Sequence, residues 1–192
     1  MPGASFIEQV ENINRAAWAM YNANPVHLKK IKMSPADIGR LFEVLAQNRV
    51  KYILIGGFAM AFHGHVRATM DIDLWVRNDP GNMEALKKAL VALGIEEVKW
   101  MRTDTQLVAG ITVFTLPDSD LSIDLMHNLK NFKEADFDNC FKNAKTGTYQ
   151  GLEIPVLEAS ELLQEKLTAS SAKDIPDIMF LANLTNYKGQ DD

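Results

Sequence analysis

Apolar residues recur at helical spacing in the first part of the chain. Residues 4–22 carry apolar side chains about every three or four positions, which predicts a helix that the Asn-Ala-Asn-Pro sequence at 22–25 ends. A second helix is expected after Ser34, a favourable capping residue followed by Pro35. The apolar stripe of this helix consists of Ile38, Leu41, Phe42 and Leu45. We expect the first helix to form an arm that packs on the core or on a partner chain.

The pattern then changes to that of strands on both sides of a glycine pair. Residues 50–55 form a short apolar run that predicts a buried strand, and Gly56 and Gly57 follow it directly. Residues 58–63 fit a short helix that starts on the glycines. Residues 69–76 alternate between apolar side chains and acidic or aromatic ones, which predicts a second strand.

The rest of the chain predicts further helices and strands in mixed order. Helices are expected over residues 82–93, 134–143, 158–170 and 173–187. Strands are expected over residues 98–101, 107–114 and 121–126. This order favours an α/β (α+β) fold with a short mixed sheet flanked by helices, not a long doubly wound sheet. We divide the chain into an N-terminal helical arm (1–33), a core (34–150) and C-terminal helices packed on the core (151–192).

Composition and charge narrow the class of protein. The chain has 192 residues, of which 47% are apolar, and this suits one domain with a real hydrophobic core. A formal net charge of −5 disfavours a broad nucleic-acid footprint but leaves a local basic patch open. The single cysteine, Cys140, excludes a disulfide framework or a cysteine zinc site within one chain. Because neither a signal peptide nor an apolar run of membrane length is found, we expect a cytoplasmic protein without a membrane-spanning segment.

The glycine pair after the first strand is the first candidate for chemistry. Glycine lets the backbone come close to a ligand, and the start of a helix presents unpaired N–H groups that attract phosphate. Taken alone, a tight turn between a strand and a helix explains Gly56 and Gly57 equally well.

Two aspartates on the second strand strengthen the functional interpretation. Asp71 and Asp73 are two positions apart, so they face the same side of a strand, roughly 6.5–7 Å apart along it. Burying both charges is costly, and a bound divalent cation removes that cost. Asp124, within an alternating Leu-Ser-Ile-Asp-Leu-Met sequence, completes a metal cluster if its strand is adjacent to theirs. The alternative is that these acids bind no metal and lie on the solvated outer face of a half-exposed strand.

Together these residues resemble the signature of the nucleotidyltransferase superfamily, which is Gly-Gly, thirteen residues, Asp-x-Asp and an acid in a later strand. The sequence YILIGGFAMAFHGHVRATMDIDLWV is similar to the core of small prokaryotic members. These are the minimal nucleotidyltransferases of toxin–antitoxin pairs and the abortive-infection toxins. The tail is also similar, with Lys166 followed by Lys173, Asp174 and Asp177, so the resemblance covers roughly residues 34–185 and leaves out the arm.

The resemblance implies a nucleotidyltransferase fold and a role for each matching residue. Gly56 and Gly57 would hold a triphosphate, although many members have Gly-Ser at this place. Asp71 and Asp73 would bind two Mg²⁺ ions, and Asp124 would share one ion and help to deprotonate the acceptor hydroxyl. The implied reaction is an in-line attack on the α-phosphate with release of pyrophosphate.

Three further residues are candidates for nucleotide binding. Arg67 lies just before the strand with the two aspartates, Thr69 lies between Arg67 and these aspartates, and Lys166 lies on a predicted C-terminal helix. An arginine presents a fork of donors that suits phosphate. The alternative to phosphate binding is that Arg67 is an ordinary surface arginine and that Lys166 lies on a solvated helix face. Ion pairs that orient the C-terminal helices are expected from Lys173, Asp174 and Asp177.

Three interpretations of function remain open at the level of sequence. The first is an Mg²⁺-dependent enzyme that moves a nucleoside monophosphate from a nucleoside triphosphate, such as ATP, to a hydroxyl of a protein, a tRNA end or a small molecule. The second is a non-catalytic module that binds nucleotide and metal and acts through a partner protein. The third is an unrelated α/β protein in which the glycines and acids coincide by chance. The resemblance also suggests an antitoxin-like partner, and the arm suggests a homodimer.

Overall fold

The computed structural model describes residues 12, 14–16, 19–20, 22–25, 35–69, 71–103, 107–169 and 171–187. Much of the predicted helix over residues 4–22, and the capping residue Ser34, therefore lie outside the described residues. Within the described part of the chain, no helix is both long and apolar enough to cross a membrane.

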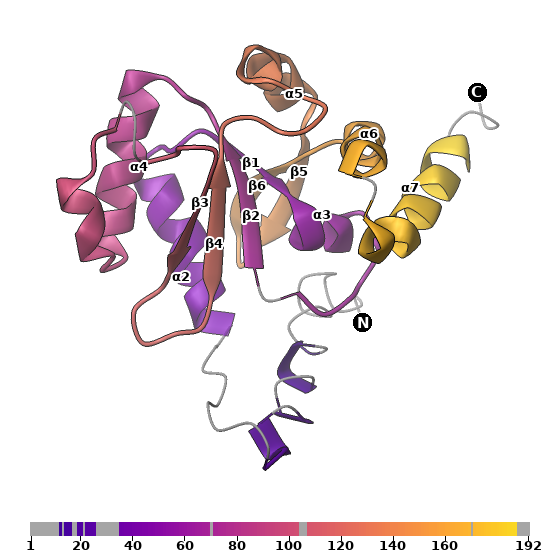
Figure 1. The fold of residues 1–192 in the computed structure, drawn as a ribbon, viewed down its shortest axis with the longest axis horizontal. Coiled ribbons are helices and arrows are strands. Elements are labelled where there is room, and N and C mark those ends of the chain that lie inside the picture. Colours follow the sequence, from indigo (N-terminus) through magenta and orange to yellow (C-terminus); the bar gives the residue numbers. More distant parts are fainter. Residues whose placement is uncertain are drawn as a thin grey trace.

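A six-stranded mixed sheet forms the centre of the molecule (Figure 1), with the strand order β3-β4-β2-β1-β6-β5. The strands are β1 (Tyr52–Ile55), β2 (Asp71–Val76), β3 (Ile111–Thr115), β4 (Ser122–Met126), β5 (Lys145–Tyr149) and β6 (Leu152–Val156). β2 pairs in parallel with β4 and antiparallel with β1, while β1 pairs in parallel with β6. This sheet confirms the predicted α/β class with a mixed sheet.

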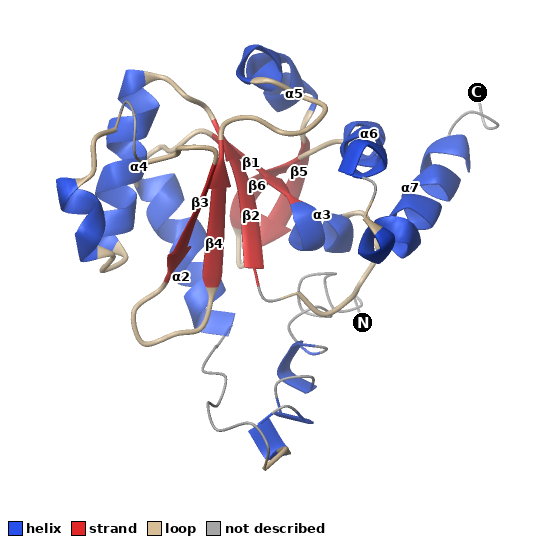
Figure 2. Cartoon of the chain, viewed as in Figure 1, coloured by secondary structure: helices blue, strands red, loops and turns tan. Residues whose placement is uncertain are grey.

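Helices flank the sheet on both sides (Figure 2). The α-helices are α2 (Pro35–Gln47), α3 (Gly56–Phe62), α4 (Pro80–Ala92), α5 (Phe137–Asn143), α6 (Ala159–Ala169) and α7 (Ile175–Tyr187). The 3-10 helices are η1 (Glu96–Trp100), η2 (Glu134–Asp136) and η3 (Ala172–Asp174). In Figure 1, α2 and α4 lie on one side of the sheet, and α3, α6 and α7 lie on the other.

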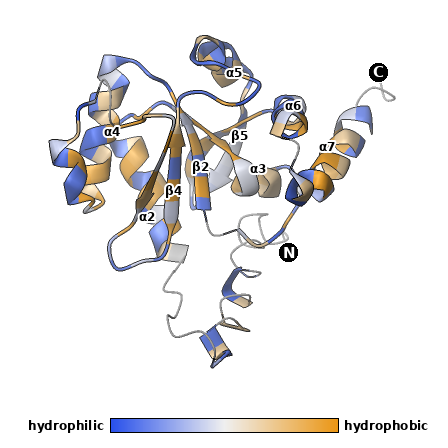
Figure 3. Cartoon of the chain, in the orientation of Figure 1, coloured by the Kyte–Doolittle hydropathy of each residue, from blue (hydrophilic) through white to orange (hydrophobic). Residues whose placement is uncertain are grey.

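Apolar side chains of strands and helices form the core, and in Figure 3 the strands β2 and β4 show orange, hydrophobic residues next to blue, hydrophilic ones. The predicted stripe of α2 is buried and consists of Ile38, Leu41, Phe42 and Leu45. Phe42 stacks on Tyr52 of β1, with ring centroids 6.3 Å apart. On the other face of the sheet, Trp75 packs against Phe132 and Phe137 at centroid distances of 6.1 and 5.2 Å. Because both faces of the central strands are covered, their sequences are rich in apolar residues.

One strand prediction in the middle of the chain is wrong, and the next one starts too early. Residues 98–101 belong largely to η1, in which Val98 is buried and Trp100 is 88% exposed. Alternation over only four residues does not distinguish a strand from a 3-10 turn. The strand predicted over 107–114 begins later, as β3, because Gly110 adopts a positive φ of 79° in the turn that precedes it.

The β5–β6 hairpin was missed by the sequence pattern. Its two turn residues, Gln150 and Gly151, have positive φ values of 48° and 81°, the backbone conformation of a tight hairpin turn. A glutamine rarely adopts positive φ, and Pro155 inside β6 argues against a strand. The hairpin includes residues on both sides of the proposed boundary between 34–150 and 151–192, a division that stays a prediction.

Candidate functional site

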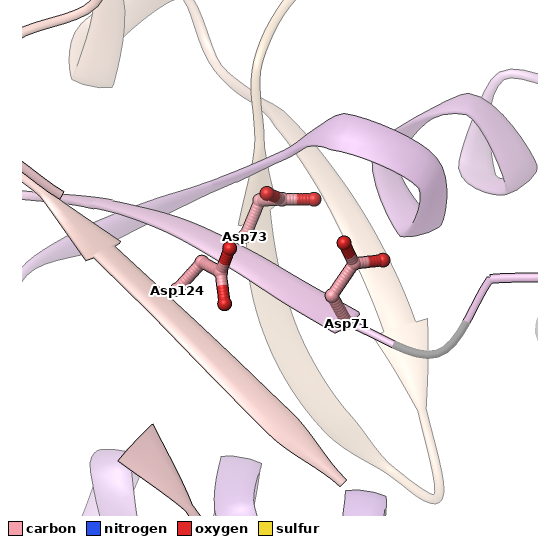
Figure 4. Close-up of side chains that lie close together, drawn as sticks. All are labelled: Asp71, Asp73 and Asp124. Atoms are coloured by element: carbon pink, nitrogen blue, oxygen red, sulfur yellow. The ribbon is translucent and has the colours of Figure 1, made fainter. Parts of the chain in front are cut away.

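Three aspartates meet on the face of the sheet that carries α3 and α6. β2 and β4 run parallel in a register that places Asp73 opposite Asp124. Asp71 lies two residues earlier on β2, so it faces the same way as Asp73. One carboxylate oxygen of each residue lies within 4.8 Å of the others, and Figure 4 shows the three carboxyl groups gathered over the two strands. We call these three residues the acid cluster.

Electrostatic repulsion inside the acid cluster is strong. Burial raises the pKa of Asp73 to about 7, and the negative charges of Asp71 and Asp124 add to the rise. The charge of Lys166 and a hydrogen bond from the Gly57 N–H oppose it without cancelling it. The sheet therefore holds the three carboxyl groups close together at a cost that a cation would offset.

Asp124 has a different balance of influences. Burial raises its pKa, and the charge of Asp71 contributes in the same direction. The Ser122 hydroxyl donates a 3.0 Å hydrogen bond to Asp124 Oδ1, which favours the ionised form and limits the rise.

The glycine pair lies directly against the acid cluster. Gly56 has φ of +64°, and a side chain at this position would overlap with the carboxyl group of Asp73. A Cβ atom on Gly57 would lie 2.5 Å from Thr69 Oγ1, so this position too has no room for a larger residue. The glycines are thus required for the close approach of β1 and α3 to β2.

A cavity of about 630 Å³ lies beside the acid cluster. Seven of the eight predicted site residues line it: Gly56, Gly57, Arg67, Thr69, Asp71, Asp73 and Lys166. Asp124 is the eighth and does not line the cavity, although its carboxylate belongs to the acid cluster. The remaining lining residues are Ala68, Lys130, Ala169, Ser171, Lys173 and Asp174.

A second group of charges, which we call the ion-pair cluster, consists of Arg67, Lys166 and Asp174, which line the same cavity, and of Asp177, which does not. Asp177 has a fully buried side chain that accepts hydrogen bonds from Arg67 Nε and Nη2, both at 3.1 Å. Lys166 Nζ lies 2.7 Å from Asp177 and 2.8 Å from Asp174. Burial opposes the charge of Asp177, but the bonds and charges of Arg67 and Lys166 prevail and lower its pKa. The His65 ring nitrogen Nε2 also lies 3.2 Å from Asp177 Oδ1, so the positive charges of Arg67 and Lys166 and this ring surround the buried carboxylate.

This arrangement places two predicted nucleotide-binding residues in a structural network. Arg67 and Lys166 line the cavity, yet both side chains also bind Asp177. The expected ion pairs of the C-terminal helices are present for Asp174 and Asp177. Lys166 pairs with both aspartates, and Arg67 also pairs with Asp177.

Sequence reasoning missed Lys130, and it considered Lys173 only as an ion-pairing residue. Both line the cavity. Lys130 lies in the loop after β4, where no periodicity marks its direction. Glu165 of α6 holds this loop, because its carboxylate accepts 2.8 Å hydrogen bonds from the backbone N–H groups of Lys130 and Asn131. Such a contact between residues 35 positions apart leaves no signal in the sequence.

The donor set of the acid cluster fits a hard divalent cation. It offers carboxylate oxygens, which Mg²⁺ prefers, and their mutual repulsion is relieved by positive charge. The cations that line the same cavity suit a phosphate chain that extends from such an ion. The arrangement can therefore bind a metal together with a polyphosphate.

A solved structure shares the fold that carries this site. The solved structure of a proposed nucleotidyltransferase from Thermotoga maritima superposes with a TM-score of 0.50 at 14% sequence identity. The alignment covers 84% of this chain and 99% of the other, which shows a shared fold. No curated protein sequence matches the chain significantly.

A sequence model of one family matches residues 40–191, which is most of the chain and includes every predicted site residue. The family is described as the nucleotidyl transferase AbiEii toxin of type IV TA (toxin–antitoxin) systems. The fold, the acid cluster and this match agree, and the chain belongs to the AbiEii nucleotidyltransferase toxin family.

Proposed function

We propose that the protein transfers a nucleoside monophosphate from a nucleoside triphosphate to a hydroxyl acceptor and that the reaction depends on Mg²⁺. Family membership gives the reaction class, nucleotidyl transfer. The observation that supports the finer statement is the meeting of Asp71, Asp73 and Asp124 at one point beside a cavity lined by cations.

Metal and triphosphate would occupy neighbouring parts of the site. The acid cluster would hold up to two Mg²⁺ ions, whose charge stabilises the entering and leaving oxygens. Lys130 and Lys173 line the cavity, and within the described residues neither ammonium group forms an ion pair with a carboxylate. We assign the β- and γ-phosphates to these two lysines. The proposed nucleotide site also includes Gly56, Gly57, Arg67, Thr69 and Lys166.

The transfer step follows from this placement. The acceptor oxygen attacks the α-phosphorus, the bond from the α-phosphorus to pyrophosphate breaks, and the hydroxyl proton passes to Asp124. Asp124 lies in the acid cluster beside the two aspartates that would hold the ions, and this position supports its role as proton acceptor. Asp71 and Asp73 act by holding positive charge against the phosphates.

We propose that the acceptor approaches across β3. Val113 lies opposite Asp124 in the β3–β4 pairing, so its side chain is on the same face of the sheet. Val113 and Ile111 are 56% and 66% exposed at the edge of the sheet. The cations, by contrast, line the cavity with Asp71 and Asp73. The open face beside Asp124 thus leaves room for an acceptor on the side away from the triphosphate.

The test is incubation of the protein with labelled ATP, CTP, GTP and UTP in turn, with Mg²⁺ and with protein, tRNA or small hydroxyl compounds as acceptors. We expect pyrophosphate release and label transfer with at least one nucleotide, and loss of both in Asp73→Asn or with a chelator. Nucleotide binding without turnover would support the alternative, a non-catalytic module that acts through a partner. Absence of both binding and turnover would contradict the proposal.

Partners and location are also proposals. The family description names a toxin–antitoxin system, so we propose an antitoxin partner and a cytoplasmic site of action. A homodimer through the N-terminal arm is a further proposal, which sedimentation of the full chain would test. A small helical or helix-turn-helix protein encoded next to the gene would support the antitoxin.

A further inference from the structure

Among the described residues of the N-terminal segment, Asn14 reaches the candidate site. Among its described residues, 12, 14–16, 19–20 and 22–25, Asn14 alone is buried, with no exposed surface. Arg15 and Ala16, its neighbours in sequence, are exposed. The family match begins at residue 40, so Asn14 belongs to a part of the chain outside it.

Both polar atoms of the Asn14 amide bind the backbone of Thr69. Asn14 Nδ2 donates to the Thr69 carbonyl at 2.6 Å, and the Thr69 N–H donates to Asn14 Oδ1 at 2.9 Å. Thr69 is 6% exposed and lies in the loop between α3 and β2, outside the sheet ladder. Buried backbone groups require partners, and here a side chain 55 residues away supplies them.

Thr69 in turn contacts the acid cluster. Its hydroxyl donates a 2.8 Å hydrogen bond to Asp71 Oδ1. The same hydroxyl lies so close to Gly57 that a methyl group there would overlap with it. The position of the Thr69 backbone therefore decides where the carboxylate of Asp71, the most exposed member of the acid cluster, is held.

We propose that Asn14 is a positioning residue for the metal site and acts through Thr69 on Asp71. The N-terminal segment then completes the site, although it lies outside the part of the chain that matches the family. This inference rests on the proposed function, because it requires the acid cluster to bind a divalent cation. A residue that only anchored the segment would affect stability and leave metal affinity unchanged.

The test is calorimetric titration of the full chain with Mn²⁺ alone, used as a probe for Mg²⁺. We expect Asn14→Ala to weaken Mn²⁺ binding about tenfold, as is usual for residues that orient metal ligands. The matched control is Asn12→Ala, since Asn12 is an exposed asparagine of the same segment, and its affinity should equal that of the wild type. Thr69→Val, which removes only the hydroxyl link, should weaken binding to a similar degree.

The double variant, Asn14→Ala with Thr69→Val, separates coupling from two independent effects. If Asn14 acts through the Thr69 hydroxyl, the double variant binds Mn²⁺ no more weakly than Thr69→Val alone. Wild-type affinity in folded Asn14→Ala, or full additivity in the double variant, overturns the inference. If Asn14→Ala does not fold, the Mn²⁺ affinity of Thr69→Val is the test. An affinity equal to that of the wild type in this variant also overturns the inference. Absence of Mn²⁺ binding in the wild type would contradict the proposed function instead.

Discussion

The acid cluster and the ion-pair cluster lie next to one cavity, and each contains a buried aspartate. The pKa values of these two aspartates are shifted in opposite directions. Asp177 receives hydrogen bonds from Arg67 and Lys166, and its pKa is lowered in spite of its burial. Asp73 faces two other carboxyl groups, and its pKa is raised to about 7. A carboxylate that is paired with cationic side chains of the protein stabilises the fold. A carboxylate that is held close to other carboxylates marks a site for a ligand.

Asp73→Asn should have the largest effect on activity. The change removes a metal-binding oxygen, so we expect transfer to fall on the order of a thousandfold or more. It also removes repulsion within the acid cluster, so the melting temperature at pH 8 should stay the same or rise by about 2–5 °C. The measurements are pyrophosphate release and thermal unfolding. Asp118→Asn, at an exposed turn position, is the control; a large loss of stability in Asp73→Asn would show that Asp73 is structural instead.

Asp177→Asn should have the opposite profile. Loss of this buried charge leaves Arg67 and Lys166 without their shared partner, and we expect unfolding free energy to fall by about 3–5 kcal/mol. Chemical denaturation measures the loss. Asp138→Asn is a matched control, because Asp138 pairs with Arg77 at 2.9 Å but is 67% exposed, and its loss should cost under about 0.5 kcal/mol. Equal losses of unfolding free energy in Asp177→Asn and Asp138→Asn would contradict the structural role of the ion-pair cluster.

Lys130→Ala should have a smaller effect, on substrate affinity. With one cation removed from the proposed phosphate site, we expect KM for the nucleotide to rise roughly tenfold with little change in kcat. Steady-state kinetics at several nucleotide concentrations would show it. Lys88→Ala, on α4 at the far side of the sheet, should leave KM unchanged. An unchanged KM in Lys130→Ala would remove this lysine from the proposed phosphate site.

The pH dependence of stability should differ in sign between the two clusters. Since the folded-state pKa of Asp73 is raised, its contribution to stability is greatest below the ordinary pKa near 3.8 and is lost as pH rises through about 7. The pKa of Asp177 is lowered, so its contribution is present above the ordinary value and is lost in acid. Melting temperatures between pH 5 and 8 should therefore fall less in Asp73→Asn than in the wild type. Identical slopes would argue that Asp73 keeps an ordinary pKa.

The acid cluster could be predicted from the sequence because every second residue of a regular strand points to the same face of the sheet. Ile72 and Leu74 alternate with Asp71 and Asp73, and the same alternation around Asp124 fixes which way each acid faces. The parallel pairing of β2 with β4 could not be read from spacing alone; there the family resemblance supplied the expectation.

Contacts between loops and distant helices left no such signal. Arg67 and Asp177 are 110 residues apart, and Asn14 and Thr69 are 55 apart. Neither pair lies in one regular element, so no periodicity relates them. The role of Lys166 shows the same limit, because its helix was predicted but its two carboxylate partners depend on how α6 and α7 pack.

The pairing of β2 with β4 makes the acid cluster sensitive to substitutions far from any carboxylate. Side chains alternate along a strand, so a slip of one residue would carry Asp124 through to the α2 side of the sheet. Ile123 and Leu125, fully buried on that side, oppose such a slip. Variants that loosen this hydrophobic layer should therefore inactivate the protein while every acid remains in the sequence.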